Sequence, residues 1–128
     1  MSIKVSSKRP LNLTAMELVS LSRLRLHDGF LWQSLTTCRK HFCPYDMVFI
    51  ARKGKKIVAW ALVESYRKKY CRFMTYVMTD YRRQGIGTIL AKAADRFAEE
   101  NRLVLGVYYH TPEAAEFFRS VKLNKDLY

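Results

Sequence analysis

The sequence has few of the features that mark membrane or secreted proteins. Its apolar residues never form an uninterrupted run near the roughly 18 residues that span a bilayer. The opening stretch MSIKVSSKRPLNLT lacks the continuous apolar segment of a signal peptide. Three cysteines, an odd number in a chain without export features, argue against a disulfide framework. We therefore expect a cytoplasmic protein, not bound to membranes, whose cysteines are reduced and mostly buried.

A complete set of metal-ligand pairs is also missing from the sequence. Cys38, His41 and Cys43 lie close together, and Cys71 could add a fourth ligand. Cys38 and Cys43 are spaced as C-x₄-C, but the sequence has no second pair of ligands at such a spacing, which common structural zinc sites need. We expect no metal site.

Acidic residues are scarce, and the imbalance is local. The chain has 23 Lys and Arg against 11 Asp and Glu, a formal net charge of +12. Residues 1–83 hold 17 of the basic and 5 of the acidic residues, whereas residues 84–128 hold six of each. Such a field attracts polyanions, acidic proteins or phosphorylated cofactors. A solvated basic face that only keeps the protein soluble explains the same charge.

The apolar periodicity predicts a mixed α/β sheet in a single domain, residues 1–128. Thr14 followed by Glu17 is a capping-box pattern, and it should start a helix that ends near Gly29. Lys53-Gly54-Lys55 separates two apolar runs as in a hairpin. The predicted strands are Ile3–Val5, two within 47–65, Cys71–Met78 and 103–109. The predicted helices are 14–29, 31–42, one that begins after residue 85 and ends at Asn101, and one from Pro112. The helix after residue 85 is expected to bury Ile89, Leu90, Ala93, Phe97 and Ala98.

The stretch YRRQGIGT (Tyr81–Thr88) joins a predicted strand to a predicted helix. Gly85 and Gly87 allow the backbone to approach a ligand, and free N–H groups at a helix start attract anions. Leu90 occupies the third glycine position of a dinucleotide fingerprint, and the P-loop pattern is absent. The stretch favours a phosphate-binding loop of another kind, with a tight turn and solvated arginines as the alternative.

The residues around this loop resemble the GCN5-related N-acetyltransferases (GNAT), whose signature is Arg/Gln-x-x-Gly-x-Gly/Ala between a strand and a helix. Residues 82–87 fit the signature, and the resemblance extends in register to Val77, Tyr81 and Leu90. It covers residues 46–123 in the order of elements. It implies the acyl-CoA N-acyltransferase fold: α/β, with a mixed, mostly antiparallel central sheet and helices on both faces, here C-terminally short because few residues follow the last predicted helix.

The resemblance also implies a cofactor. In the family, acetyl-CoA lies where the strand before the loop splays from the strand after the helix. Val77 would then face the pantetheine, and the pyrophosphate would be held by seven consecutive residues, Arg82, Arg83, Gln84, Gly85, Ile86, Gly87 and Thr88.

Catalysis by such an enzyme needs a base, because a lysine amine with a pKa of about 10.4 is charged at neutral pH. Residues 71–78 contain no carboxylate, so Glu64 on the neighbouring strand and His110 are the candidates. A backbone N–H near Val77 to Thr79 would stabilise the tetrahedral intermediate. Phe118 occupies the place where relatives commonly carry a tyrosine that protonates the leaving thiolate, so the activity is expected to be slow unless Tyr108, Tyr109 or water replaces it.

The leading hypothesis is an acetyl-CoA-dependent N-acetyltransferase that transfers the acetyl group to an amine of a protein. The basic charge predicts that the acceptor, or a partner protein, is acidic. The alternative from another class is a weak or inactive GNAT-fold protein that serves as a basic protein-interaction module. Nucleic-acid binding by the RKGKK and YRKKY segments is a weaker third reading, because no recognised nucleic-acid motif accompanies them. A homodimer that covers the short C-terminal edge of the sheet is a further expectation.

Overall fold

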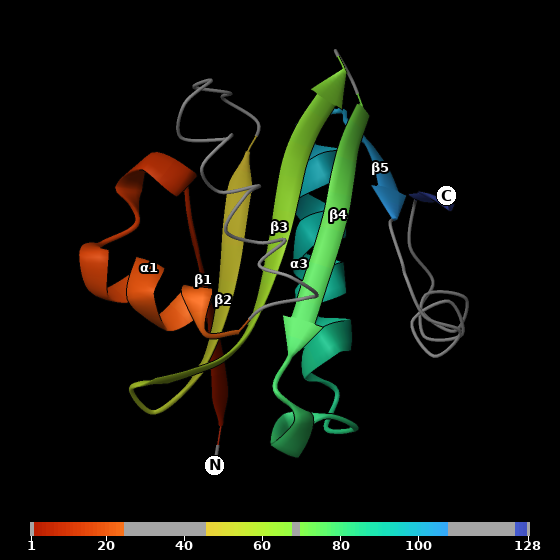
Figure 1. The fold of residues 1–128 in the computed structure, drawn as a ribbon. Coiled ribbons are helices and arrows are strands. Elements are labelled where there is room, and N and C mark those ends of the chain that lie inside the picture. Colours follow the sequence, from red (N-terminus) through yellow and green to blue (C-terminus); the bar gives the residue numbers. More distant parts are fainter. Residues whose placement is uncertain (1, 25–45, 68–69, 108–124, 128) are drawn as a thin grey trace.

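The computed structural model describes residues 2–24, 46–67, 70–107 and 125–127 (Figure 1). They form one six-stranded sheet in the spatial order β1-β2-β3-β4-β5-β6. β1 to β4 pair antiparallel, whereas β4–β5 and β5–β6 pair parallel. The elements are β1 (Ile3–Lys8), η1 (Pro10–Asn12), α1 (Ala15–Ser22), β2 (Met47–Lys53), β3 (Lys56–Arg67), β4 (Tyr70–Val77), η2 (Thr79–Tyr81), α3 (Ile86–Glu100), β5 (Val104–Val107) and β6 (Lys125–Leu127).

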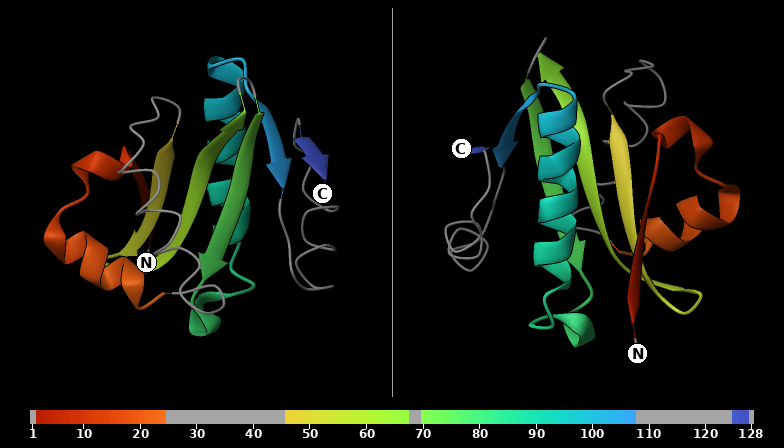
Figure 2. Two further views of the ribbon diagram at one scale, coloured as in Figure 1. Left: turned by 45° about the horizontal axis from the view of Figure 1, so that its top comes forward. Right: turned by 180° about the vertical axis from the view of Figure 1, so that it is seen from behind.

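Helices lie on both faces of the sheet, as predicted (Figure 2). Successive side chains of a strand point to opposite faces, so β2 and β3 supply two separate cores. Phe49 and Ala61 pack toward α3, while Val48 and Trp60 pack toward α1. The predicted mixed and mostly antiparallel sheet is therefore confirmed.

Local chemistry explains most element boundaries. The capping box at Thr14 and Glu17 forms as predicted and starts α1. The predicted hairpin forms between β2 and β3, with Gly54 at φ 63°. Asn101 caps the C-terminus of α3, again as predicted. The first helix was predicted to end near Gly29, but α1 ends at Ser22, because the amides of Arg23 and Leu24 donate to carbonyls only three residues back. The predicted helices at 31–42 and after Pro112, and Tyr108–Tyr109, lie outside the described residues.

The buried face of α3 differs from the prediction. Ile89, expected in the core, is 47% exposed, and Ala93 and Phe97 are only partly buried. Ala91 and Ala94 are fully buried instead. Small side chains let the helix approach the sheet closely, and their weak hydrophobicity hides this role in the sequence.

Candidate cofactor site

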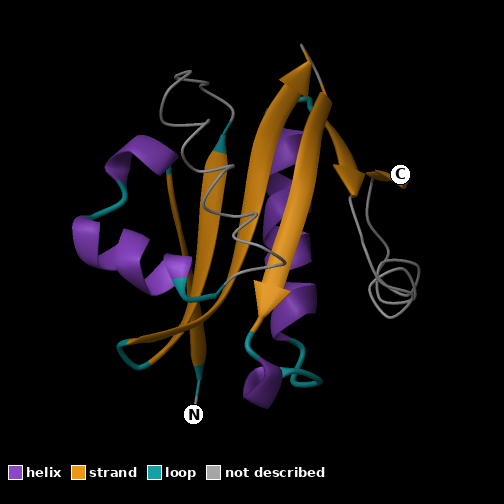
Figure 3. Cartoon of the chain, in the orientation of Figure 1, coloured by secondary structure: helices purple, strands orange, loops and turns teal. Residues whose placement is uncertain are grey.

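The loop between β4 and α3 has a backbone that few residues adopt. It begins with η2, and two residues are in the left-handed region: Arg83 at φ 63° and Gly85 at φ 81°. Gly85 is the N-cap of α3 and adopts this conformation without the cost of a Cβ, whereas Arg83 carries that cost. Figure 3 shows the loop at the end of β4 where the chain turns into α3.

The loop presents a run of free backbone donors. In α3 the first amide with an acceptor is that of Ile89, which donates to the Gly85 carbonyl (3.0 Å). Among the described residues, none of the six N–H groups of residues 83–88 has an intramolecular acceptor. The side chains of Arg83 and Gln84 are exposed beside them. Unpaired amides at a helix start, where the helix dipole is positive, favour a bound anion.

The end of β4 has an edge that β5 does not cover within the described residues. The last described pair between these strands is Phe73 with Val107, although β4 continues to Val77 beside β3. Figure 1 shows the arrowhead of β5 lying apart from β4. The Met78 amide donates to the Val58 carbonyl of β3 (2.9 Å). Because backbone groups alternate along an antiparallel strand, Val77 directs its N–H and C=O to the opposite side, toward β5.

Arg82 turns back onto this strand. Its Nε donates to the Val77 carbonyl (2.9 Å), and its guanidinium carbon lies 5.5 Å from the centre of the Tyr76 ring. Tyr76 in turn stacks on the fully buried Trp60, with 6.4 Å between ring centres. The guanidinium is thus fixed by a hydrogen bond and by a cation–π contact. Arg82 was predicted to hold pyrophosphate, and here its side chain contacts the strand.

Two lysines of the β2–β3 hairpin reach the same loop. The ammonium groups of Lys53 and Lys56 lie 5.4 and 5.6 Å from the centre of the Tyr81 ring. The two lysines face each other across the strands, an arrangement that repels. Within the described part of the chain, neither lysine pairs with a carboxylate. With Arg83 they make the surroundings of the loop strongly positive.

The predicted base Glu64 is buried and paired. Its Oε1 accepts a hydrogen bond from Arg72 Nη2 at 2.5 Å, across the β3–β4 register. Arg72 and Val77 are five residues apart along β4, about 17 Å at roughly 3.4 Å per residue. Glu64 therefore does not lie beside the loop. The other predicted groups of the reaction, His110 and Phe118, lie outside the described residues.

The structure reduces the number of backbone amides near Val77 to Thr79 that could stabilise the tetrahedral intermediate. The Met78 amide is engaged with Val58, so that residue cannot supply the donor without breaking the bond. The Val77 amide, in contrast, points away from β3 toward the uncovered edge of β4. Sequence reasoning missed Tyr76 as the platform for Arg82, although its position next to Val77 places it on the opposite face of the strand.

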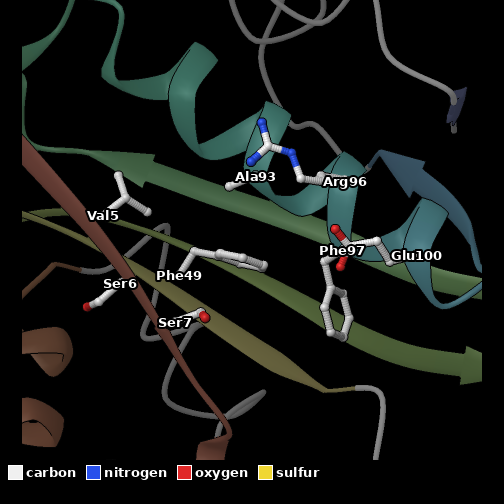
Figure 4. Close-up of a pocket in the computed structure, with 8 residues that line it drawn as sticks. All are labelled: Val5, Ser6, Ser7, Phe49, Ala93, Arg96, Phe97 and Glu100. Atoms are coloured by element: carbon white, nitrogen blue, oxygen red, sulfur yellow. The ribbon is translucent and has the colours of Figure 1, made fainter.

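A groove of about 260 Å³ lies elsewhere, between β1 and the C-terminal half of α3 (Figure 4). Phe49 and Phe97 meet edge to face on its inner side, with ring centres 6.1 Å apart, and Arg96 and Glu100 border it. It is remote along α3 from the loop. No cluster of metal-ligating side chains occurs among the residues that the structure describes. None of the helices in those ranges is long and apolar enough to cross a bilayer.

Several solved structures have a fold similar to that of this chain. The chain is similar to an aminoglycoside acetyltransferase from an uncultured soil metagenomic sample, with 22% identity, a TM-score of 0.66 and coverage of 97% of this chain and 90% of that one. It is also similar to the ribosomal-protein-S18-alanine N-acetyltransferase from Escherichia coli, with 21% identity, a TM-score of 0.66 and coverage of 91% and 73%. The aminoglycoside acetyltransferase AAC(6')-Iy, solved with a CoA-containing bisubstrate analogue, is 13% identical, with a TM-score of 0.70 and coverage of 96% and 91%.

No curated protein matches the chain in sequence. A family model does: the one described as the acetyltransferase (GNAT) family matches residues 16–121, most of the chain. The match includes β2 to β5, α3 and the loop with the free amides. The chain therefore belongs to the GNAT family of acetyltransferases.

Proposed function

We propose that this N-acetyltransferase binds acetyl-CoA with its diphosphate on the loop of residues 83–88 and transfers the acetyl group to an amine of a protein. Members of the GNAT family use acetyl-CoA. The single observation that carries the proposal is the run of six amides at the start of α3 without acceptors among the described residues. A diphosphate provides the oxygens that these donors lack, and the Arg83 guanidinium adds charge-assisted hydrogen bonds.

The edge of β4 supports the position of the pantetheine. Val77 directs its N–H and C=O away from β3, beyond the last described pair with β5. A pantetheine amide can pair with such an edge as an added strand does. The cofactor then runs from the loop along β4, and its thioester lies against strand backbone that can donate to the oxyanion.

The positive side chains near the loop are the basis for proposing an acidic protein as the acceptor. Lys53, Lys56 and Arg83 surround the loop without carboxylate partners in the described ranges. An acidic protein surface would be steered to this end of the molecule. The base is either His110 or Glu64; Glu64 would serve only where the acceptor reaches the Glu64–Arg72 pair, since that pair is distant from the loop.

The cofactor site is tested by NMR titration of the ¹⁵N-labelled protein with CoA. The largest amide shifts should occur at residues 83–88, with adenosine, which lacks phosphates, as the control ligand. A ligand at 100 times its Kd adds about 2.7 kcal/mol of stability, so melting should rise on the order of 10 °C. Shifts confined to another part of the chain would contradict the proposal.

The acceptor is tested separately, by mass spectrometry of a proteome incubated with the enzyme and labelled acetyl-CoA. New acetylation at lysines or N-termini flanked by acidic residues is the expected result. Binding of CoA without any acetylated product would instead favour the basic interaction module. Nucleic-acid binding that weakens steeply with salt would favour the third reading.

A further inference from the structure

The two arginines of the loop differ in their surroundings. The Arg82 side chain is hydrogen-bonded to the strand before the loop, whereas Arg83 is exposed and makes no side-chain hydrogen bond, ion pair or ring contact with the described residues. Both were expected to hold phosphate, yet only Arg83 is free to do so as the structure stands.

The Arg82 guanidinium lies over the face of the sheet that packs toward α1, opposite to the face that α3 covers. Tyr76, which the guanidinium covers, packs with the core that faces α1. α3 packs against the opposite face. The loop amides belong to α3 and to the residues just before it, so the Arg82 guanidinium and these amides flank β4 from different sides.

The contact that Arg82 makes instead is at the uncovered edge. Val77 is the last residue of β4 and extends beyond the last described pair with β5. A strand end with an unpaired edge frays readily. The hydrogen bond from Nε to the Val77 carbonyl, backed by the Tyr76 and Trp60 stack, fixes that end. The carbonyl keeps a second lone pair for a ligand donor.

We propose that Arg82 is a positioning residue, which fixes the Val77 edge of β4 for the pantetheine arm, whereas Arg83 supplies the charge for the diphosphate. This inference rests on the proposed acetyl-CoA site. It predicts that the two arginines affect different parts of the same cofactor.

Two substitutions separate the contribution of the Arg82 hydrogen-bond donor from that of its charge. In Arg82→Gln the amide nitrogen stands the same number of bonds from Cα as Nε, so the donor stays and the charge is lost. Arg82→Met has a similar length and no donor. Arg83→Gln and Arg83→Met are the matched controls one position along.

Binding of two ligands is measured by calorimetry at about 0.15 M salt, where charges beyond roughly 8 Å are screened. One ligand is CoA; the other is adenosine 3′-phosphate 5′-diphosphate, which keeps the diphosphate and lacks pantetheine. We expect Arg82→Met to weaken CoA binding about tenfold and nucleotide binding less than about twofold. Arg82→Gln should bind both ligands within about threefold of the unmodified protein. Both Arg83 variants should weaken the two ligands by the same factor.

The inference is overturned if Arg82→Gln weakens both ligands as much as Arg82→Met does, because charge on the phosphates would then be its role. It is also overturned if no Arg82 variant changes CoA binding. Failure of the unmodified protein to bind either ligand would instead refute the proposed acetyl-CoA site. Unliganded melting curves check folding, and if Arg82→Met is unfolded, Arg82→Ala, which also lacks the donor, takes its place.

Discussion

Glu17 ties α1 to the sheet, and its removal has a calculable effect. The residue is 8% exposed, and its carboxylate accepts hydrogen bonds from Lys8 Nζ (2.8 Å), the Thr14 amide (2.9 Å) and Arg52 Nη2 (2.7 Å). Burial alone would raise the pKa of Glu17, but the hydrogen bonds from Lys8, Thr14 and Arg52 outweigh it and lower the pKa from 4.5 to about 2. The carboxylate is thus stabilised in the folded state.

The lowered pKa sets the size and pH range of the effect. At roughly 1.4 kcal/mol per unit, the difference between 4.5 and about 2 corresponds to about 3 kcal/mol. Because the folded pKa of Glu17 lies below the unfolded one, this stability is fully present above pH 4.5 and is lost as the pH falls toward 2.

Glu17→Gln tests this reasoning, since Gln can still accept from the Thr14 amide but carries no charge for Lys8 and Arg52. Urea unfolding followed by circular dichroism should show a loss of about 3 kcal/mol at pH 7, and the gap should close between pH 4.5 and 2. Glu99→Gln, at an exposed site without an ion pair in the described ranges, should stay within about 0.5 kcal/mol. A gap that is absent at pH 7, or that stays constant to pH 2, would refute the reasoning.

Three further predictions concern the backbone and the core. Gly85→Ala and Gly54→Ala should each cost about 1 kcal/mol in urea unfolding, because both positions have positive φ, but only Gly85→Ala should reduce the melting shift that acetyl-CoA produces. Arg102→Gly, which relieves φ 56° just beyond the end of α3, should stabilise by up to about 1 kcal/mol and leave CoA affinity unchanged; a loss of stability would contradict this reading. Leu90→Ala, fully buried between α3 and the sheet, should cost about 2–5 kcal/mol.

Much of the fold could be predicted because its signals are local. The capping box at Thr14, the Gly54 turn and the Asn101 cap depend on bonds or dihedral angles within a few residues, and each formed where the sequence indicated. The two apolar runs on either side of this turn likewise indicated the β2–β3 hairpin. The loop before α3 was recognisable for the same reason, since Gly85 can adopt the left-handed conformation that the turn into the helix uses.

Other features depend on neighbours distant in sequence. Glu64 pairs with Arg72 only because of the register between β3 and β4, and Glu17 meets Arg52 only because α1 packs on that face. The burial of Ala91 in place of Ile89 follows from how closely α3 approaches the sheet.

The sequence by itself determined the order of the described elements from β1 to β5, the turns and a loop able to present its amides to an anion, since these follow from short-range sterics and hydrogen bonding. Only the tertiary structure decided that Arg82 bonds to Val77 and covers Tyr76 while Arg83 is left exposed. Adjacent arginines look alike in a sequence. Their directions are set by backbone dihedral angles and by the ring that packing places beneath one of them.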